Sequence, residues 1–235
     1  MKLNYFQSGF NYSQDGPGNR LVYHLQGCNM RCPWCSNPEG IDIDGKASAT
    51  EITALVNYAQ SCIAMFFGGG GVTLTGGEPT VQYEAIAAFL TSLKAAGINT
   101  AVETNGTHPS LPELFDVIDH LMIDFKHPDD AIHRELTGIG NAQIKRNIEA
   151  ASEQGKPIVV RLLLLEGHNT AHLQDYLDYF TRLDTSRISF EFLRYHEYGR
   201  DKWKEYIFSP AFVPDETLQK FIHGFEQAGL KIVKT

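Results

Sequence analysis

The chain has 235 residues, enough for one domain with a full hydrophobic core. Its 28 acidic and 20 basic residues give a net charge of −8, which argues against a general nucleic-acid-binding protein. No apolar stretch is long enough to cross a bilayer, since the longest, residues 158–165, contains Arg161. We therefore expect a protein that binds neither nucleic acid nor membrane.

Short β-branched or apolar runs alternate with longer amphipathic runs along the chain. The runs predict strands at 21–26, 72–75, 99–104, 120–124, 158–165 and 187–193. They predict helices at 49–64, 82–96, 110–117, 142–154, 170–183 and 214–228. Gly97 and Gly155 follow two of these helices as typical C-terminal stops.

Repeated strand–helix alternation predicts a parallel sheet with right-handed crossovers. A closed eight-fold barrel usually takes about 250 residues. We therefore expect an α/β fold, an incomplete (β/α)6 barrel in a single domain, with an open doubly wound sheet as the alternative. The expected parts are an N-terminal extension over about 1–20, a core over about 21–195, and a C-terminal helix and strand over about 214–235.

Three of the four cysteines lie in one short loop after the first expected strand. Cys28, Cys32 and Cys35 have the spacing C-x3-C-x2-C. A [4Fe-4S] cluster normally takes four cysteines, so three leave one iron open, and catalytic metal sites keep such a position free. A zinc site completed by Cys62 or His24, or a disulfide, is the alternative. Residues 1–7 do not resemble a secretory leader, and we expect reduced thiols in the cytoplasm.

Polar residues follow the other expected strands. They are Thr75-Gly76-Gly77-Glu78-Pro79, Glu103-Thr104-Asn105-Gly106, Asp124-Phe125-Lys126 and Tyr195-His196. In parallel α/β folds the carboxyl ends of strands meet at one edge, where the loops carry the chemistry. Arg161 lies inside the apolar fifth strand, where a charge is costly unless it is paired, and this favours a ligand-binding role over a structural one.

Together these residues resemble a radical S-adenosylmethionine (SAM) enzyme, and within that superfamily a glycyl radical enzyme activase of the pyruvate formate-lyase-activating type. The cysteine spacing marks the superfamily. Asp15-Gly16-Pro17-Gly18 with Arg20, and Tyr195-His196-Glu197-Tyr198-Gly199 with Lys202-Trp203, narrow it to activases. The resemblance also includes Gly69-Gly70-Gly71-Val72. Only Cys62 lies beyond Cys35, so no second cluster is expected, which favours the short type of activase.

The resemblance implies a set of cofactor-binding residues. Cys28, Cys32 and Cys35 would hold the [4Fe-4S] cluster, whose open iron would bind the methionine end of SAM. Further contacts to the cofactor would come from Trp34, Asn37, Gly76, Gly77, Glu78, Glu103, Thr104, Lys126, Arg161 and His196. A monovalent cation, Na⁺ or K⁺, would bind Glu103, Thr104, Met122 and Asp124, although familiar activases have aspartate where Glu103 stands.

The resemblance also implies the reaction and its partners. The chain would be an oxidoreductase, monomeric on its own, that reductively cleaves SAM and abstracts a Cα hydrogen from a glycine of a glycyl radical enzyme. Asp15, Gly16, Pro17, Gly18 and Arg20 would contact the partner's glycine loop. Flavodoxin or ferredoxin would deliver the electron, steered by Arg31, Arg200, Lys202 and Lys204.

Two other functions remain open from the sequence. One is a radical SAM enzyme acting on a small molecule, similar to 7-carboxy-7-deazaguanine synthase, against which the Asp-Gly-Pro-Gly segment counts. The other is an iron–sulfur electron carrier, against which the polar residues after the strands count.

Overall fold

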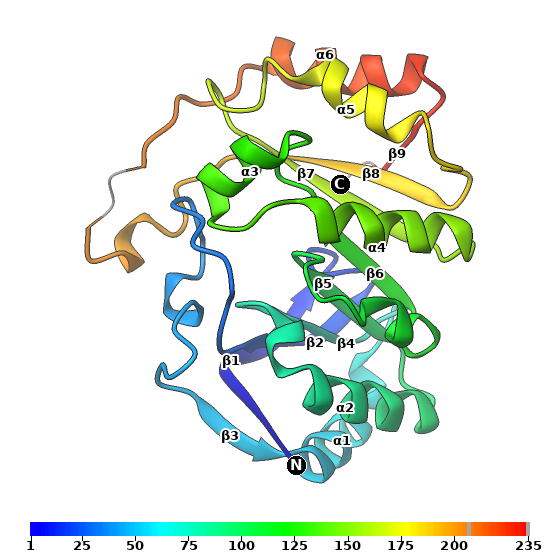
Figure 1. The fold of residues 1–235 in the computed structure, drawn as a ribbon. Coiled ribbons are helices and arrows are strands. Elements are labelled where there is room, and N and C mark those ends of the chain that lie inside the picture. Colours follow the sequence, from blue (N-terminus) through cyan, green and yellow to red (C-terminus); the bar gives the residue numbers. More distant parts are fainter. Residues whose placement is uncertain (206–207, 234–235) are drawn as a thin grey trace. The chain divides into compact units, whose positions relative to one another are not determined.

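The structure, a computed structural model, describes residues 1–205 and 208–233 (Figure 1). Residue contacts divide the chain into two compact units. The first contains Met1–Asn29, Asn37–Thr104 and Ser110–Leu121, and the second contains Met30–Ser36, Asn105–Pro109 and Met122–Thr235. No helix among the described residues is long and apolar enough to cross a membrane.

The first unit is a mixed sheet with two helices. Its strands are β1 (Lys2–Tyr12), β2 (Asn19–Leu25), β3 (Ser48–Glu51), β4 (Gly71–Gly76) and β5 (Thr100–Thr104), in the order β3-β1-β2-β4-β5. β1 is antiparallel to β2 and β3, whereas β2, β4 and β5 are parallel. The helices are α1 (Ile52–Ser61) and α2 (Tyr83–Ala95), with 3-10 turns η1 (Pro38–Gly40), η2 (Ile63–Met65), η3 (Pro79–Gln82) and η4 (Leu111–Val117).

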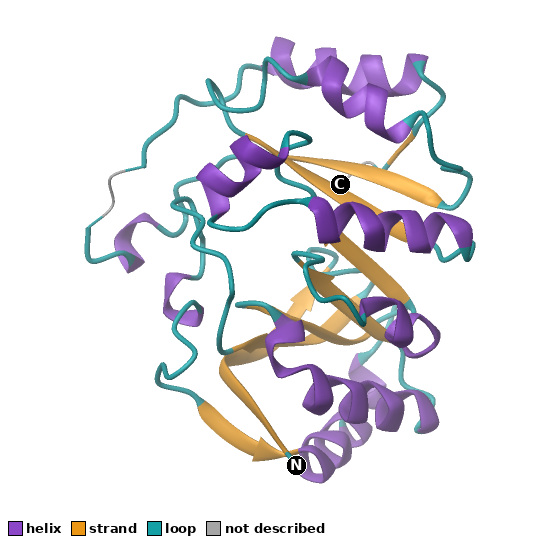
Figure 2. Cartoon of the chain, viewed as in Figure 1, coloured by secondary structure: helices purple, strands orange, loops and turns teal. Residues whose placement is uncertain are grey.

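β6 (His120–Asp124) begins in the first unit and ends in the second, which adds the parallel strands β7 (Ile158–Leu164), β8 (Ile188–Arg194) and β9 (Lys231–Ile232). Its helices are α3 (Asp130–Thr137), α4 (Ala142–Glu153), α5 (Leu173–Phe180) and α6 (Asp215–Gln227), with the 3-10 turn η5 (Arg200–Lys202) (Figure 2). Phe190 and Phe192, on one face of β8, pack their rings against Phe180 of α5 and Phe225 of α6. Glu191 therefore points to the other face of β8.

The six predicted strands correspond to β2, β4, β5, β6, β7 and β8, each within two residues at either end. Gly97 and Gly155 adopt positive φ angles of 71° and 63° two residues after the ends of α2 and α4, as expected for C-terminal stops. The α/β class with a mostly parallel sheet is confirmed.

Two local expectations are wrong, and one strand was not predicted. The helix expected at 49–64 starts later, because residues 48–51 form β3, which pairs with β1 from Lys2↔Glu51 to Tyr5↔Ser48. The helix expected at 110–117 is the 3-10 turn η4. Residues 2–12, which lie within the expected N-terminal extension and were not predicted as a strand, form the long strand β1.

Candidate functional site

The carboxyl ends of β2 and β4 lie side by side in the first unit, because Leu25 pairs with Gly76 in the parallel register. Cys28 follows β2, and Gly77 and Glu78 follow β4. Gly77 N donates to Leu25 O at 2.9 Å and Glu78 N donates to Gly27 O at 2.7 Å. The Gly-Gly-Glu turn is thus tied to the residues that lead into the first cysteine.

The two glycines of this turn are required by the backbone around them. Gly76 has a φ of +103°, and a Cβ there would lie 2.5 Å from His24 Cα. A Cβ on Gly77 would lie 2.2 Å from Gly27 O and 2.6 Å from Gly40 O. Close backbone packing is therefore a sufficient reason for both glycines, and their contact with a cofactor stays a prediction.

Glu78 holds the turn together from inside. Its side chain is buried, and Oε1 accepts hydrogen bonds from Thr80 N at 2.9 Å, Thr80 Oγ1 at 2.6 Å and Thr104 Oγ1 at 2.6 Å. Glu103 Oε2 accepts from Thr75 Oγ1 at 2.8 Å. The Glu78 carboxylate after β4 is therefore bonded by a threonine of β5, and the Glu103 carboxylate of β5 by a threonine of β4.

The cysteine loop passes from the first unit to the second after Asn29. Cys28 N donates to Ile41 O at 3.1 Å, and Cys35 N donates to Cys32 O at 3.1 Å. None of the four cysteines is in a disulfide, and Cys32 is buried whereas Cys28 and Cys35 are partly exposed. The disulfide alternative is thus not supported, and three cysteine thiols within eight residues are the soft donors that an iron–sulfur cluster takes.

Residues 199–203 fix the end of the cysteine loop. Trp203 Nε1 donates to Cys35 O at 3.0 Å, and Lys202 Nζ donates to Ser36 O at 3.0 Å. A Cβ on Gly199 would lie 2.4 Å from Cys35 O, so the two backbones are in close contact. Residues 195–203 carried the resemblance to activases, but this contact with the third cysteine had no signal in the sequence.

Cys62 lies at the other end of β2 from Cys28. Met65 N donates to Cys62 O at 2.8 Å, and Asn19 Nδ2 donates to Met65 O at 2.8 Å. Asn19 begins β2, while Cys28 follows its carboxyl end, about 20 Å away at strand spacing. A zinc site completed by Cys62 is therefore excluded. Among the described residues, no group of three His, Cys, Asp or Glu side chains could hold a single metal ion.

Asp15-Gly16-Pro17-Gly18 also lies at the amino end of β2, in the turn between β1 and β2. Ser13 N donates to Gly18 O at 3.0 Å, and a Cβ on Gly18 would lie 2.4 Å from Phe67 O. The turn is thus packed against the glycine-rich loop before β4, at the opposite end of the strand from Cys28.

Arg20 is fully buried beneath that turn. Its guanidinium donates to Thr73 Oγ1 at 2.6 Å, Val72 O and Asn99 Oδ1 at 2.9 Å, and Pro17 O at 3.2 Å. Burial lowers the pKa of Arg20 to about 10, against the opposing effect of the Asp119, Asp15 and Glu103 carboxylates. The enclosed side chain of Arg20 holds the turn, and a contact between Arg20 and a partner stays a prediction.

In the second unit, Arg161 pairs with a residue not among those expected from the sequence. Arg161 and Glu191 are register partners on β7 and β8, and Arg161 Nε lies 2.8 Å from Glu191 Oε2. Both side chains are largely buried. Burial of Arg161 therefore does not require a ligand, which corrects that part of the sequence argument. The only signal for Glu191 was one charge in the alternating run Phe190-Glu191-Phe192.

Asp124 and Lys126 extend this charged group at the end of β6. Lys126 Nζ donates to Asp124 Oδ2 at 2.8 Å, and Phe125 N donates to Arg161 O at 2.9 Å. Burial acts to raise the pKa of Asp124, but Lys126 and Arg161 outweigh it and the pKa lies below its usual value. The end of β6 thus carries an ionised carboxylate beside two cations.

The remaining expected residues lie in varied settings. Trp34 is buried, with its ring 5.4 Å from that of Phe208. His196 is exposed and stacks on Tyr198 at 4.9 Å. Asn37 precedes η1, where its carbonyl accepts from Gly40 N at 3.0 Å, and Met122 is buried within β6.

Comparison with known proteins places this geometry in a family. A sequence model of the Radical SAM superfamily matches residues 22–180, more than half of the chain. The chain is 32% identical over 232 residues to the pyruvate formate-lyase 1-activating enzyme of Escherichia coli K12, covering 93% of each chain. The chain belongs to the pyruvate formate-lyase-activating family of radical SAM enzymes. It is also 32% identical over 201 residues to the pyruvate formate-lyase-activating enzyme of Staphylococcus epidermidis, covering 81% of this chain and 80% of that enzyme.

Solved structures agree with this assignment. A domain of pyruvate-formate lyase-activating enzyme from Bacteroides vulgatus has a TM-score of 0.60 and 26% identity, covering 70% of this chain and 98% of that one. Streptococcus suis SuiB bound to S-adenosylmethionine has a TM-score of 0.70 at 16% identity, covering 91% of this chain and 49% of that one, and is similar in fold alone. The radical SAM fold and the class of activating enzyme are thus confirmed, and membership implies a [4Fe-4S] cluster and SAM.

Proposed function

We propose that the chain activates a glycyl radical enzyme of the pyruvate formate-lyase type by removing a hydrogen atom from a glycine Cα. The observation that carries the proposal is the similarity to the Escherichia coli enzyme over 93% of both chains, which exceeds the extent of a shared core. We assign one radical SAM domain to residues 1–235, with the extension, core and C-terminal parts bounded at about 20, 195 and 214.

Cys28, Cys32 and Cys35 would hold the cluster. When bound, the cluster and SAM supply the one-electron reductive cleavage and the hydrogen-atom abstraction. The protein itself orients the reacting groups and excludes water from them. The bonds from Cys28 N to Ile41 O and from Trp203 Nε1 to Cys35 O fix the two ends of the loop.

We assign the binding of SAM to the turn after β4 and to the charged group of the second unit. In the first unit, Gly76, Gly77, Glu78, Glu103, Thr104 and Asn37 are assigned. In the second, Lys126 and Arg161 supply positive charge for a carboxylate, while Trp34 and His196 supply rings for the adenosine. We assign the binding of the monovalent cation to Glu103, Thr104, Met122 and Asp124. The lowered pKa of Asp124 supports this assignment, because it keeps that carboxylate ionised.

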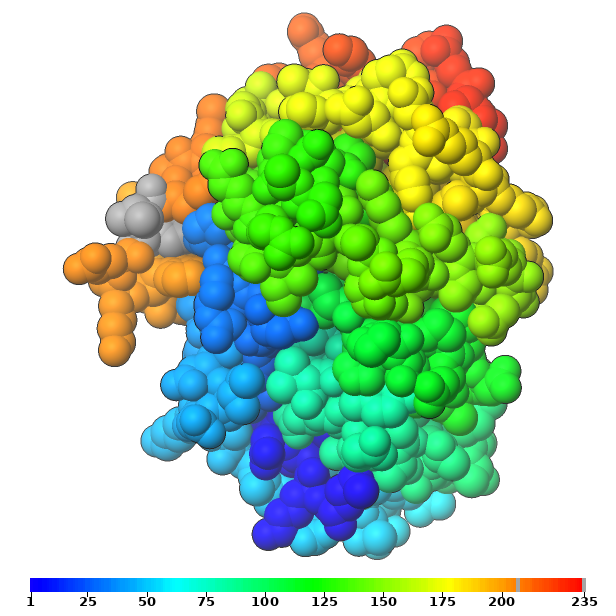
Figure 3. Space-filling model, viewed as in Figure 1, coloured from blue at the N-terminus to red at the C-terminus, as the bar shows by residue number. Residues whose placement is uncertain are grey.

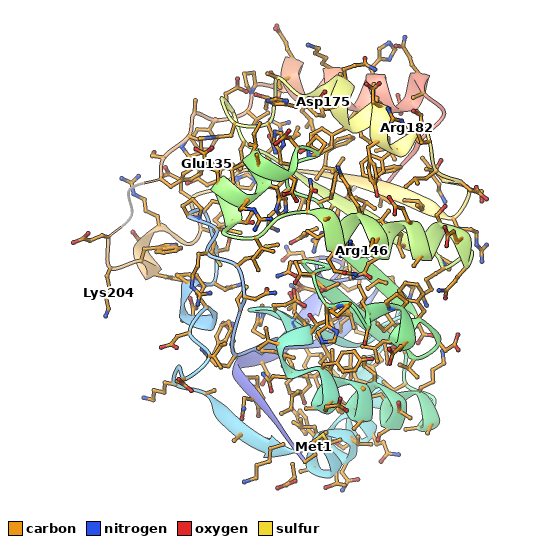
Figure 4. All side chains as sticks on the ribbon, in the orientation of Figure 1. Met1, Glu135, Arg146, Asp175, Arg182 and Lys204 are labelled. Atoms are coloured by element: carbon orange, nitrogen blue, oxygen red, sulfur yellow. The ribbon has the colours of Figure 1, made fainter. Side chains whose placement is uncertain are left out.

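We propose a flavodoxin or ferredoxin as the electron donor, with Arg31, Arg200, Lys202 and Lys204 as the steering charges. Arg200 pairs with Glu197 at 2.9 Å and Lys202 is held on Ser36 O, while Lys204 projects into solvent (Figure 4). We expect the protein to be cytoplasmic and monomeric before it meets its partner.

The experiment uses anaerobically reconstituted protein with dithionite, SAM and full-length pyruvate formate-lyase. We expect a glycyl radical signal in electron paramagnetic resonance and formation of 5′-deoxyadenosine, both lost in Cys32→Ala. SAM cleavage without a protein radical, stimulated by a small metabolite, would overturn the proposal in favour of a small-molecule enzyme. Cluster reduction without any cleavage of SAM would instead identify an electron carrier.

A further inference from the structure

Half of β1 has no strand on its outer side. β3 pairs only with residues 2–5, and a bulge at Phe6 separates this part from the rest. From Gln7 to Tyr12, β1 pairs with β2 on one side, and no strand among the described residues pairs with the other. The residues of this open edge are exposed except for the half-buried Asn11. The amino-terminal segment, dark blue in Figure 3, lies at the molecular surface.

The backbone of this edge is oriented to accept another strand. Ser13 N donates to Gly18 O at 3.0 Å across the β1–β2 turn. Because bonded pairs alternate in an antiparallel ladder, Asn11, Gly9 and Gln7 direct their backbone groups towards β2. Ser8, Phe10 and Tyr12 therefore direct theirs outwards along the open edge.

Gly9 is unexplained by the fold itself. Its φ is not positive, and a Cβ there would meet no atom within 4 Å. A glycine inside a strand weakens it and often marks a position where another backbone approaches closely. Gly9 thus differs from Gly18 and Gly77, where neighbouring backbone excludes a side chain.

The surface beside the edge is apolar and uncharged. The Phe10 ring lies 6.3 Å from Phe66 and the Tyr12 ring lies 5.9 Å from Phe67. Phe10, Tyr12, Met65 and Phe67 are 40–60% exposed. No charged residue occurs between Lys2 and Asp15 or between Glu51 and Glu78. Proteins usually protect such edges with lysine, proline or a cover. Residues 7–12 contain neither lysine nor proline, and no strand in the described part of the chain covers them.

We propose that an extended, uncharged, aromatic- or aliphatic-rich segment of the glycyl radical partner adds as a strand to the β1 edge, residues 7–12. This inference rests on the proposed function. Strand addition supplies affinity through main-chain hydrogen bonds and specificity through alternate side chains, here received by Phe10, Tyr12, Phe66 and Phe67. The surface is continuous with the Asp15–Gly18 turn, which begins three residues after Tyr12.

The edge also leads towards the cysteine loop. β1 runs antiparallel to β2, so the edge starts at the amino end of β2 and finishes near Phe6. A Cβ on Gly40 would lie 2.5 Å from the Phe6 ring, and Gly40 O accepts from Gly27 N, one residue before Cys28. A strand laid along β1 is thus directed to the loop that carries the first cysteine. A second copy is a poorer occupant, because each chain carries a charge of −8.

The test compares Phe10→Lys with Phe212→Lys, which makes the same change at another exposed phenylalanine. The probes are full-length pyruvate formate-lyase and a short peptide containing its glycine loop. We expect Phe10→Lys to weaken binding of the full-length protein by about tenfold or more, with peptide-stimulated SAM cleavage unchanged. Phe212→Lys should bind as the wild type does.

Hydrogen exchange on the wild type gives a second measurement that needs no variant. The amides of Ser8, Phe10 and Tyr12 should exchange more slowly when full-length pyruvate formate-lyase is bound. Unchanged exchange, or unchanged affinity in Phe10→Lys, would overturn the docking inference while leaving the activase function intact. A wild-type protein that binds but forms no radical would overturn the function alone. A wild-type dimer that Phe10→Lys dissociates would assign the edge to a second copy and refute the inference.

Discussion

Arg161 on β7 and Glu191 on β8 form a largely buried cross-strand ion pair, with Arg161 Nε 2.8 Å from Glu191 Oε2. The pair holds the guanidinium at one position beside the Asp124–Lys126 pair. Removing one member of a buried pair leaves the other charge uncompensated, typically at a cost of about 3–5 kcal/mol.

We therefore expect Glu191→Gln to lower the free energy of unfolding by about 2 kcal/mol or more, because the amide keeps a hydrogen bond but loses the charge. Binding of SAM should weaken as well, if Arg161 serves its carboxylate. Urea unfolding and calorimetric titration would measure the two effects. Glu197→Gln, which removes a more exposed pair with Arg200, should cost less than about 1 kcal/mol.

The four cysteines should divide into two classes. Alanine at Cys28, Cys32 or Cys35 should abolish the reconstituted cluster, because three thiolates are the fewest that hold it here. Cys62→Ala should keep wild-type iron and sulfide, since Cys62 lies at the amino end of β2. Loss of iron from the Cys62 variant would contradict the open-iron assignment.

Gly77→Ala should be strongly destabilising, because the added Cβ would lie 2.2 Å from Gly27 O. We expect a loss of about 3 kcal/mol or more in thermal or urea unfolding. Gly9→Ala is the matched control, since its Cβ would enter open space. It should change stability by no more than about 0.5 kcal/mol. Equal effects at both positions would show that backbone packing is not the reason for Gly77.

His127 should make the fold sensitive to acid. Burial, reinforced by His172 at a ring distance of 4.5 Å and by His133, lowers the pKa of His127 to about 4, although the Asp129 carboxylate favours the proton. An unfolded histidine binds a proton below about 6.5, so between pH 6.5 and 4 the unfolded state holds more protons. Stability contributed by neutral His127 is therefore complete above pH 6.5 and lost as the pH falls towards 4.

We expect His127→Gln to lose less stability than the wild type when the pH is lowered from 7 to 5, measured by urea midpoints. His223, an exposed histidine on α6, provides the control, and His223→Gln should follow the wild-type pH dependence. If His127→Gln loses as much stability between pH 7 and 5 as the wild type, His127 does not contribute to the acid sensitivity.

The parallel strands could be predicted from the sequence because strands buried on both faces form continuous apolar runs bounded by glycine or charge. β1 escaped prediction because its outer half is exposed and lacks a buried face. α3 escaped because eight residues show too few turns of a helical pattern, although Asp129 caps its start and Gly138 ends it at a φ of 87°. Local sequence gives little evidence for an element whose formation depends on tertiary contacts.

The cysteine motif could be predicted because all its members are close in sequence. The partners of Arg20 and Arg161 could not, because Thr73, Asn99 and Glu191 come from strands or loops 30 to 79 residues away. The two arginines look alike in sequence, each a cation in an apolar strand. Arg20 proves fully enclosed by carbonyl oxygens and the Thr73 hydroxyl, whereas Arg161 pairs with the Glu191 carboxylate.

The contacts of Trp203 and Gly199 with the Cys35 carbonyl have a consequence for when the cluster can be inserted. The donor and the acceptor are 168 residues apart, so the ribosome completes the cysteine motif long before the residues that fix its third member exist. We expect a nascent or truncated chain ending before residue 199 to take up iron and sulfide poorly. The cluster would then be inserted efficiently only into the completed polypeptide.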